Sequence, residues 1–581
     1  MPGILITLVI ALPWIGAVVV WLARNKHARL QHTLAVLFSI LTAIASVVLL
    51  RFASAETVKF PFLFGKAFGD LTFVPDGLAV TLTAIAAVIG SLAVIFSVDY
   101  MHGEEQLGRY YFLVLFFIGS MTGLVLSGNL LFTFFFWEIT ALCSYGLISF
   151  YNDDPKAVAG GIKALIITQV GGVGLLAGTL IAFPHVGFQI SDFLGKASSI
   201  PAASLSLIAF SFLVAAAAKS AQFPFHTWLP DAMEAPTPIS ALIHAATMVN
   251  AGIYLLARFY PAFEDVPGWT MAVLLVGLIS AVISAISALI ATDLKRTLAY
   301  STVSQLGYMV YAIGAGGVFA SQFHLLSHAV FKALLFLAAG SVIHSVGTRD
   351  MRRMGGLGQQ MPFVRNVFIV GAVALAGILP LNGFWSKELI LEVGLEHSPI
   401  WAYGLMLLGA GLTAFYTFRM VWLVFFGAER DRLHVHPAGS AMKVSLFILA
   451  AGTFVTWLFF GGLNSLLAST MPFHELEHET TWEVVTVILS APATWLAMVV
   501  VLVGAGISWV RARGFRLFGG EWFRPLTDSA FGFEPVNRFV VGSTYKVAEW
   551  FSVTQTGELN WNILGIISAL LVVLIVLWLG A

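Results

Sequence analysis

Several charged or histidine side chains of this 581-residue chain stand inside long apolar stretches. Glu138 is the one acidic or basic residue of LLFTFFFWEITALCSYGLISF, and His244 is the one in SALIHAATMVNAGIYLL. Lys219 closes LIAFSFLVAAAAKS, shortly before Pro224. A charge at mid-membrane costs at least about 2.5–3.5 kcal/mol, so it is kept where it pairs, faces water or functions. We interpret these side chains as groups that accept a proton and pass it on.

Two further stretches carry the same kinds of side chain. In QFHLLSHAVFKALLFLAAGSVIH, His324, His328 and Lys332 are spaced by four residues, which places them on one face of a helix. Lys387 and Glu388 follow the interruption in ALAGILPLNGFWSKELILEVG. Stacked titratable groups about 6 Å apart pack poorly as a core but suit a proton relay.

Each of these residues also has a purely structural interpretation. Glu138, Lys219 and Lys332 could form buried ion pairs, and the histidines could make satisfied hydrogen bonds between helices. Lys387 could extend its amine to the membrane surface. Two other charged features are interpreted as structural: a turn at Asp293, Lys295 and Arg296, and a helix cap at Asp76.

The elements that position these residues are membrane helices. Hydrophobic residues make up 59% of the chain and charged residues only 10%, against about 25% in soluble domains. About 20 apolar residues span a bilayer, and we count sixteen such stretches. They lie near 3–23, 30–50, 78–98, 110–127, 129–150, 162–183, 204–222, 239–259, 270–292, 297–316, 321–344, 363–383, 400–425, 444–465, 490–511 and 562–580.

Two of the predicted spans are interrupted. Pro224 follows the seventh span, and Pro380 and Gly383 fall in the twelfth, each close to a lysine. Secondary transporters place ion sites at such breaks, in folds built from inverted repeats. The sequence therefore predicts an all-α integral membrane fold with two inverted five-helix repeats. The predicted divisions are helices 1–3 (1–109), a first repeat (110–260), a second repeat (261–430) and C-terminal helices with a short amphipathic segment (431–581).

Most Lys and Arg residues fall in the loops on one side of this predicted topology. Positive charge stays on the cytoplasmic side during insertion, which places both termini outside. The first apolar stretch lacks a basic n-region and a small-residue cleavage site, and a second span follows it at once. It is expected to remain as helix one rather than to be removed as a signal peptide.

Motifs for other functions are few. The single cysteine, Cys143, excludes a CxxC pair or an iron–sulfur cluster bound by this chain alone. There is no G-x-x-x-x-G-K-[ST] loop and no basic run typical of nucleic-acid binding. We expect no cofactor, metal, redox site or hydrolytic site in this chain, so that electron chemistry would belong to a partner.

One motif favours a competing interpretation as an enzyme. His474-Glu475-Leu476-Glu477-His478 matches H-E-x-x-H, the zinc-binding helix of many metalloproteases. That motif needs both histidines on one helix turn and a folded domain to supply a third ligand. Here the loop is short, and we expect a solvated acidic loop.

Several long blocks, in order, resemble the antiporter-like subunits shared by respiratory complex I, Mrp-type cation/proton antiporters and membrane-bound energy-converting hydrogenases. These blocks are FWEITALCSYGLISF, KSAQFPFHTWLPDAMEAPTPISALIHAATMVNAGIYLL, DLKRTLAYSTVSQLGYM, HLLSHAVFKALLFLAAGSVIH, GTRDMRRMGGL and GFWSKELIL, within residues 60–425. The residues of these blocks and the length of sixteen predicted spans most resemble those of the L-type subunit of NADH:quinone oxidoreductase or the A-type Mrp subunit.

The resemblance implies roles for the same residues. Glu138 and Lys219 would form the pair where a proton enters, Lys332 with His244, His324 and His328 the central relay, and Lys387 with Glu388 the exit. Partners would be other membrane subunits and a redox or peripheral catalytic module, in a prokaryotic inner membrane. The alternatives are a Na⁺(K⁺)/H⁺ antiporter subunit, or the proton-conducting subunit of a membrane-bound hydrogenase or an inorganic-carbon uptake complex.

Two departures from L-type subunits stand out. Gly172 occupies a position where many L-type subunits have an aspartate. Pro525 and Pro535 also forbid one long straight lateral helix between the last two spans. A shorter amphipathic segment at 533–551 is expected to lie along the membrane surface and contact a neighbouring subunit.

Overall fold

Helices dominate the structure, a computed structural model that describes residues 1–23, 27–60, 69–429, 435–512 and 524–552. Within these residues, 13 helices are long and apolar enough to cross a membrane. A chain in lipid must satisfy its backbone N–H and C=O groups internally, which a helix does. The predicted all-α membrane fold is confirmed, and this is an integral, multi-pass membrane protein.

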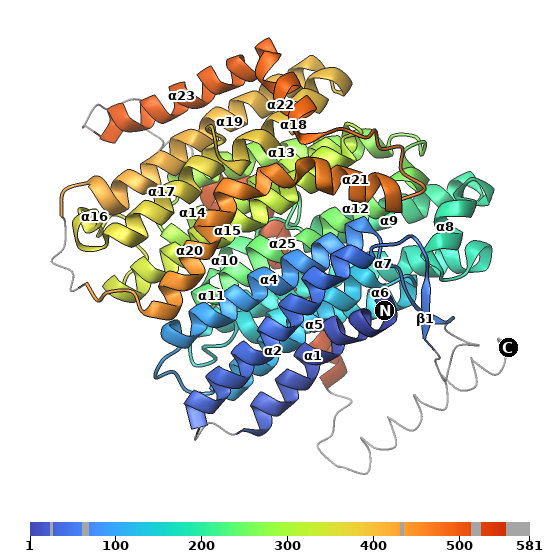
Figure 1. Cartoon of the computed structure of the whole chain (residues 1–581), viewed down its shortest axis with the longest axis horizontal. Coiled ribbons are helices and arrows are strands. Elements are labelled where there is room, and N and C mark those ends of the chain that lie inside the picture. Colours follow the sequence, from blue (N-terminus) through green and yellow to red (C-terminus); the bar gives the residue numbers. More distant parts are fainter. Residues whose placement is uncertain (24–26, 61–68, 430–434, 513–523, 553–581) are drawn as a thin grey trace. The chain divides into compact units, whose positions relative to one another are not determined.

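The candidate membrane helices lie largely side by side, from α1 and α2 to α19 and α23 (Figure 1). They are α1 (Pro2–Leu22), α2 with its 3-10 turn (Ala28–Phe52), α4 (Gly77–Tyr100), α5 (Leu107–Leu126), α6 (Leu130–Ile148), α7 (Pro155–Val186), α9 (Ala202–Lys219), α11–η5–α12 (Thr237–Phe263), α13 (Trp269–Ile290), α15 (Val318–Val346), α19 with η6 (Ile400–Phe426), α20–η7–α21 (Ser440–Thr470) and α23 (Pro492–Ala512).

The other three predicted spans differ from these. Helix α14 (Leu294–Gly314) is long enough to cross, but its polar side chains make it less apolar. The predicted span 363–383 contains α17 (Pro362–Ala376) and then a break, and it ends where the next helix, α18 (Asn382–His397), begins. The predicted span 562–580 lies outside the described residues.

Both predicted interruptions are present. Helix α9 ends at Lys219, and the chain turns before the short helix α10 (Trp228–Asp231), with Pro224 in the turn. Helix α17 ends before Gly377, whose φ of 79° is left-handed, and the chain then restarts as α18. Each break frees backbone carbonyls that a side chain can contact.

A third irregularity was not predicted. The run from Thr237 to Phe263 contains α11 (Thr237–Ala241), a π-helical turn η5 (Leu242–Ala246) and α12 (Asn250–Phe263). A π-turn inserts an extra residue into the helix, often at a functional site. His244 stands within it.

The connecting segments gather at two opposite ends of the helices, as an alternating topology requires. At one end, strands β1 (Val58–Phe60) and β2 (Leu71–Phe73) pair antiparallel, and Phe73 of β2 also forms an isolated antiparallel β-bridge with Ser127. At the other end, the backbones of Asp293 and Asp350 pair in an isolated antiparallel β-bridge. The remaining short helices are α8 (Ile190–Lys196), η3 (Ala197–Ser199), η4 (Ala232–Glu234), α16 (Leu357–Gln360), α22 (Thr481–Ser490), α24 (Arg524–Asp528) and η9 (Ala530–Gly532).

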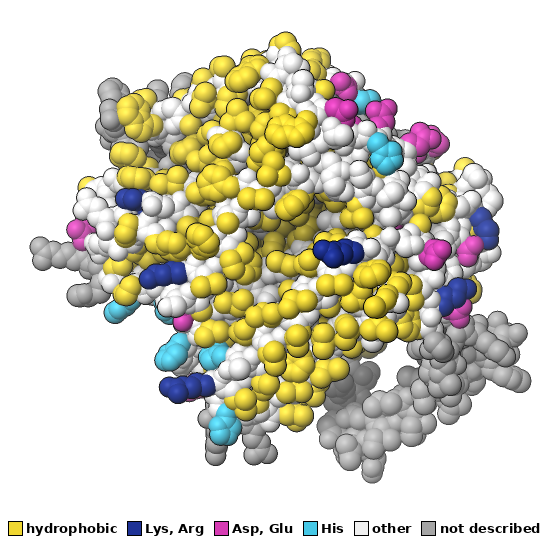
Figure 2. Space-filling view, in the orientation of Figure 1, with side chains coloured by type: hydrophobic (Ala, Val, Ile, Leu, Met, Phe, Trp, Pro, Cys, Tyr) yellow, Lys and Arg dark blue, Asp and Glu magenta, His cyan; other side chains and the backbone are white. Residues whose placement is uncertain are grey.

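Close packing inside and apolar side chains outside suit a helix array in lipid. At the α13–α14 crossing, a Cβ on Gly307 would lie 2.6 Å from the Ala281 nitrogen, so only glycine permits this approach. Outward-facing side chains such as Ile44 of α2 and Phe447 of α20 are exposed. Figure 2 shows apolar side chains over most of one face, with only scattered Lys and Arg.

The described residues before Gly532 and those from Gly532 to Ser552 belong to two separate compact units. The second contains α25 (Phe533–Ser552), a helix over the predicted amphipathic segment, with Phe539 and Trp550 exposed. The backbone before it is not one straight helix, because Phe531 and Gly532 both have positive φ. The predicted absence of a long lateral helix is confirmed for residues 524–552.

Candidate functional site

Lys219 stands beside Glu138, as predicted. The lysine is fully buried at the end of α9, and its Nζ donates to the carbonyl oxygen of Trp137 at 2.8 Å. The same Nζ lies 4.8 Å from the centre of the Trp137 ring, within range of a cation–π interaction. Trp137 precedes Glu138 in α6, so the amine lies near enough to the carboxylate for the two charges to interact, but no ion pair joins them among the described residues.

The Glu138 carboxylate has one strong partner. Its Oε2 accepts a hydrogen bond from Nε2 of Gln169 on α7. Its Oε1 is buried and has no hydrogen-bond partner among the described residues. Buried carboxylate oxygens are normally satisfied, so this oxygen is poised to accept a proton or a water.

His244 lies deeper in the molecule, on the π-turn. It is fully buried, with its ring centre 6.2 Å from those of Trp228 and Phe336. Neither ring nitrogen has a hydrogen-bond partner in the described part of the chain. The alternative interpretation, a satisfied hydrogen bond between helices, is therefore wrong for His244.

The three predicted residues of α15 are all fully buried. Lys332 Nζ donates to Ser301 Oγ on α14. His324 is satisfied, since its Nδ1 lies 2.9 Å from Ser386 Oγ and its Nε2 lies 3.2 Å from Gln305 Oε1. His328 stands between them, 6.3 Å ring to ring from His324, and neither of its nitrogens has a partner within the described ranges.

Lys387 and Glu388 complete the set on α18, at 1% and 6% exposure. Lys387 Nζ donates to the Leu375 carbonyl at 2.8 Å, one of the carbonyls freed where α17 breaks. The Nζ also lies 5.8 Å from the centre of the Tyr308 ring. The alternative in which Lys387 reaches the membrane surface is wrong, because the side chain points back into the protein.

The predicted residues therefore come from helices that are in contact. Helix α7 packs on α6 and α9, and α15 packs on η5 and α18. Sequence reasoning missed the polar partners of these residues, namely Gln169, Ser301, Gln305 and Ser386. Uncharged polar side chains can make hydrogen bonds between membrane helices at many positions, so no local signal marks these four.

Lys295, interpreted from the sequence as part of a structural turn, is more buried than the sequence indicated. The predicted turn is real, since Asp293 caps α14 by accepting from the Arg296 amide at 3.0 Å. Lys295, however, is only 3% exposed, and its Nζ donates to the Ala235 carbonyl at 2.5 Å. It also interacts electrostatically with His244.

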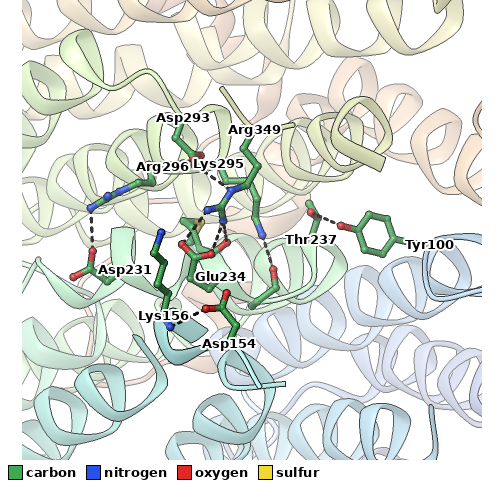
Figure 3. Close-up of polar contacts among 12 residues, drawn as sticks. Tyr100, Asp154, Lys156, Asp231, Glu234, Thr237, Asp293, Lys295, Arg296 and Arg349 are labelled. Carbon is green, nitrogen blue, oxygen red and sulfur yellow. Dashed lines mark hydrogen bonds and ion pairs between the residues drawn. The ribbon is translucent and has the colours of Figure 1, made fainter. Parts of the chain in front are cut away.

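An ion-pair cluster surrounds this turn (Figure 3). Asp231 pairs with Lys163 at 2.7 Å and with Arg296 at 3.0 Å. Arg349 pairs with Glu234 at 2.9 Å and with Asp293 at 3.2 Å. These contacts tie α10 and η4, which follow the first break, to α7, α14 and the loop after α15.

The opposite end of the helices carries a buried pair. Asp76 caps α4, as predicted, by accepting from the Ala79 amide at 3.0 Å. It also forms a two-point ion pair with the buried Arg258 of α12, in which Arg258 Nη2 donates to Asp76 Oδ1 at 2.9 Å. The sequence did not predict this partner.

The H-E-x-x-H segment lies at this same end. Residues 471–480 form no helix, so the two histidines do not share a helix turn. His474 Nε2 lies 2.8 Å from the Ala257 carbonyl, and burial lowers the pKa of His474 to about 4, whereas His478 is exposed. Among the described residues no group of three or more His, Cys, Asp or Glu side chains could hold a metal. Within the described residues, the segment lacks the helix and the third ligand that the zinc-protease motif requires.

Comparisons with known proteins agree with this arrangement. Residues 127–413 match the family model "NADH:quinone oxidoreductase/Mrp antiporter, TM", and residues 66–111 match "NADH-Ubiquinone oxidoreductase (complex I), chain 5 N-terminus". The chain is 44% identical over 378 residues to NAD(P)H-quinone oxidoreductase chain 5 of Picosynechococcus sp., covering 62% of this chain and 57% of that protein.

A second relative is NAD(P)H-quinone oxidoreductase subunit 5 of Paulinella chromatophora, 39% identical over 82% of this chain and 69% of that protein. The chain thus spans about 57–69% of the length of these relatives.

Solved structures show the same fold. A chain of the Mrp complex from Dietzia sp. matches with a TM-score of 0.81 at 28% identity, covering 99% of this chain and 63% of that chain. A chain of an archaeal membrane-bound sulfane sulfur reductase matches with a TM-score of 0.74 at 25% identity, covering 83% of this chain and 99% of that chain. The chain belongs to the NADH:quinone oxidoreductase/Mrp antiporter family of membrane subunits.

Proposed function

We propose that this chain is a proton-translocating membrane subunit of a multisubunit complex, most like the L-type subunit of NADH:quinone oxidoreductase. The observation that carries the proposal is a set of Glu, Lys and His side chains, all buried except the half-buried Glu138, that is spread over α6, α9, η5, α15 and α18. Buried charges are expensive in a membrane protein and mark ion pathways. The set comprises Glu138, Lys219, His244, His324, His328, Lys332, Lys387 and Glu388.

The contacts of the lysines support transfer rather than static pairing. Lys219, Lys332 and Lys387 donate to a carbonyl or hydroxyl oxygen, which are neutral acceptors. A neutral acceptor holds the amine in place without strongly favouring its charged form, so the proton can leave. Buried nitrogens without a protein partner, as on His244 and His328, are usually hydrated, and water can bridge the gaps between members.

Electrostatics would couple the steps. Glu138 stabilises a proton on Lys219 while the two lie close, and separation of the pair favours release toward the next group. The breaks after α9 and α17 stand beside Lys219 and Lys387 and give the helices a place to move. We further propose the repeat divisions 110–260 and 261–430, flanked by 1–109 and 431–581.

The second candidate function is a Na⁺(K⁺)/H⁺ antiporter subunit. It is favoured by the Mrp-complex chain, whose match covers 99% of this chain. Nearly the same residues would serve both functions, so the identity of the partners decides. A proton-conducting subunit of a membrane-bound hydrogenase or of an inorganic-carbon uptake complex would use them as well.

The cellular setting is part of the proposal. The chain would sit in a prokaryotic inner membrane with both termini outside, beside other membrane subunits and a redox or peripheral catalytic module. No cofactor would be bound by this chain itself. The segment α25 would contact a neighbouring subunit.

Proton uptake by proteoliposomes tests the proposal. The native assembly is purified with the wild-type chain, Lys219→Ala or Glu138→Gln, and uptake is followed with and without Na⁺. Lys196→Ala is the control, because that lysine forms an exposed ion pair with Asp192. Loss of uptake in both variants but not in the control supports the row of buried groups, and dependence on Na⁺ favours the antiporter. Unchanged uptake in both variants would overturn the proposal.

A further inference from the structure

Two residues of α7 surround the Glu138 carboxylate. Gln169 donates from Nε2 to Oε2 of Glu138. Gly172 lies one helical turn further on, and a Cβ added there would collide with Oε1 of Glu138. Residues three apart share a helix face, so the two approach the carboxylate from the same side.

The two contacts act on different oxygens of the carboxylate. The amide hydrogen bond from Gln169 stabilises the ionised carboxylate, because a donated hydrogen bond favours the charged form. Oε1 is buried and unpartnered among the described residues, and it packs against Gly172 at the position that a Cβ would take. One oxygen is therefore held and the other is kept free.

We propose that Gln169 and Gly172 are positioning residues that hold Glu138 ionised with one oxygen free to receive a proton. This inference rests on the proposed function, in which Glu138 is the first proton acceptor. In this inference, the uncharged residues Gln169 and Gly172 of α7 control the pH at which Glu138 accepts a proton. The side chain of Gln169 supplies the donor, and the missing side chain of Gly172 supplies the room.

The test measures the initial rate of proton uptake against pH for the native assembly in proteoliposomes. Gln169→Leu removes the donor and should move the midpoint of the profile upward by about one pH unit, because a hydrogen bond to the charged form is lost. Infrared difference spectra should show the protonated Glu138 carboxyl persisting to higher pH by the same amount. A merely structural residue would lower the rate without moving the midpoint.

Gly172→Ala provides an independent variant that keeps Gln169. The added methyl meets the flexible end of Glu138 rather than backbone, so the fold should tolerate it while the carboxylate is displaced. The same upward shift is expected. Gln31→Leu is the matched control, because Gln31 is a buried glutamine whose amide donates to the Val20 carbonyl, and it should leave the midpoint unchanged.

The outcomes separate the two proposals. If Glu138→Gln and Lys219→Ala both transport normally, the proposed function fails. If Glu138→Gln is inactive while Gln169→Leu and Gly172→Ala keep the wild-type midpoint in both transport and infrared measurements, this inference is wrong and the proposed function stands.

Discussion

Three of the buried lysines, Lys219, Lys332 and Lys387, differ in how their acceptors could be altered. Lys219 and Lys387 contact backbone carbonyls, which mutation cannot remove, whereas Lys332 contacts the hydroxyl of Ser301. A side-chain acceptor can be deleted without changing the helix that carries it. The contribution of a neutral acceptor to transfer can therefore be measured at Lys332.

Ser301→Ala should slow proton uptake by about tenfold. The change removes the hydroxyl that holds the Lys332 amine in place, and such a hydrogen bond contributes about 0.5–1.5 kcal/mol, the upper end of which corresponds to about a tenfold change in rate. Initial uptake rates in proteoliposomes measure the effect. Ser304→Ala is the control, because Ser304 is on the same helix and donates to the Ala281 carbonyl instead. Equal uptake rates for the two variants would show that the contact between Ser301 and Lys332 does not contribute to proton uptake.

Individual side chains also join elements that are far apart in sequence. Asp76 and Arg258 connect the start of α4 to the end of α12, and both are buried. Breaking a buried pair on one side leaves an uncompensated charge, which is among the costliest single changes in a protein.

Asp76→Asn should reduce the free energy of unfolding by about 3–5 kcal/mol, since Arg258 loses its counter-charge. Asparagine can still cap α4, so the loss reports the ion pair rather than the cap. Thermal unfolding in detergent measures it. Asp192→Asn, which disrupts an exposed pair with Lys196, should change stability by less than about 1 kcal/mol. Comparable losses in both variants would refute the argument.

At the scale of elements, the loop 471–480 should respond to pH through His474. Burial lowers the pKa of His474 to about 4, below its usual 6.5, so the neutral imidazole is the form that fits beside Ala257. The stability that this contact gives the folded loop is fully present above pH 6.5 and is lost as the pH falls toward about 4. Proteolysis or hydrogen exchange of the loop should therefore increase over that interval.

His478→Gln should keep this pH response, because His478 is exposed. His474→Gln should remove the response, since no titratable imidazole would remain beside Ala257. A loop that opens equally over the same pH range in both variants would contradict the assignment to His474.

For the whole molecule, much of the fold follows from the sequence because a long apolar stretch in lipid forms a membrane-spanning helix. The breaks were visible as Pro224 and Pro380, and each buried charge stood out within an apolar run. The π-turn around His244 and the burial of Lys295 were not predictable. Both depend on contacts with residues distant in sequence, such as Phe336 and Ala235, which a local pattern does not contain.

Because the chain has a single cysteine and this cysteine is buried, thiols introduced elsewhere can be labelled selectively. Cys143 is 3% exposed, so a membrane-impermeant maleimide should leave the wild-type protein unmodified. Lys196→Cys and Asp153→Cys would each add one exposed thiol at opposite ends of the helices. With both termini outside, the reagent should label Lys196→Cys in intact cells and Asp153→Cys only after the cells are opened. The reverse order of labelling would contradict the proposed orientation and place both termini on the inner side.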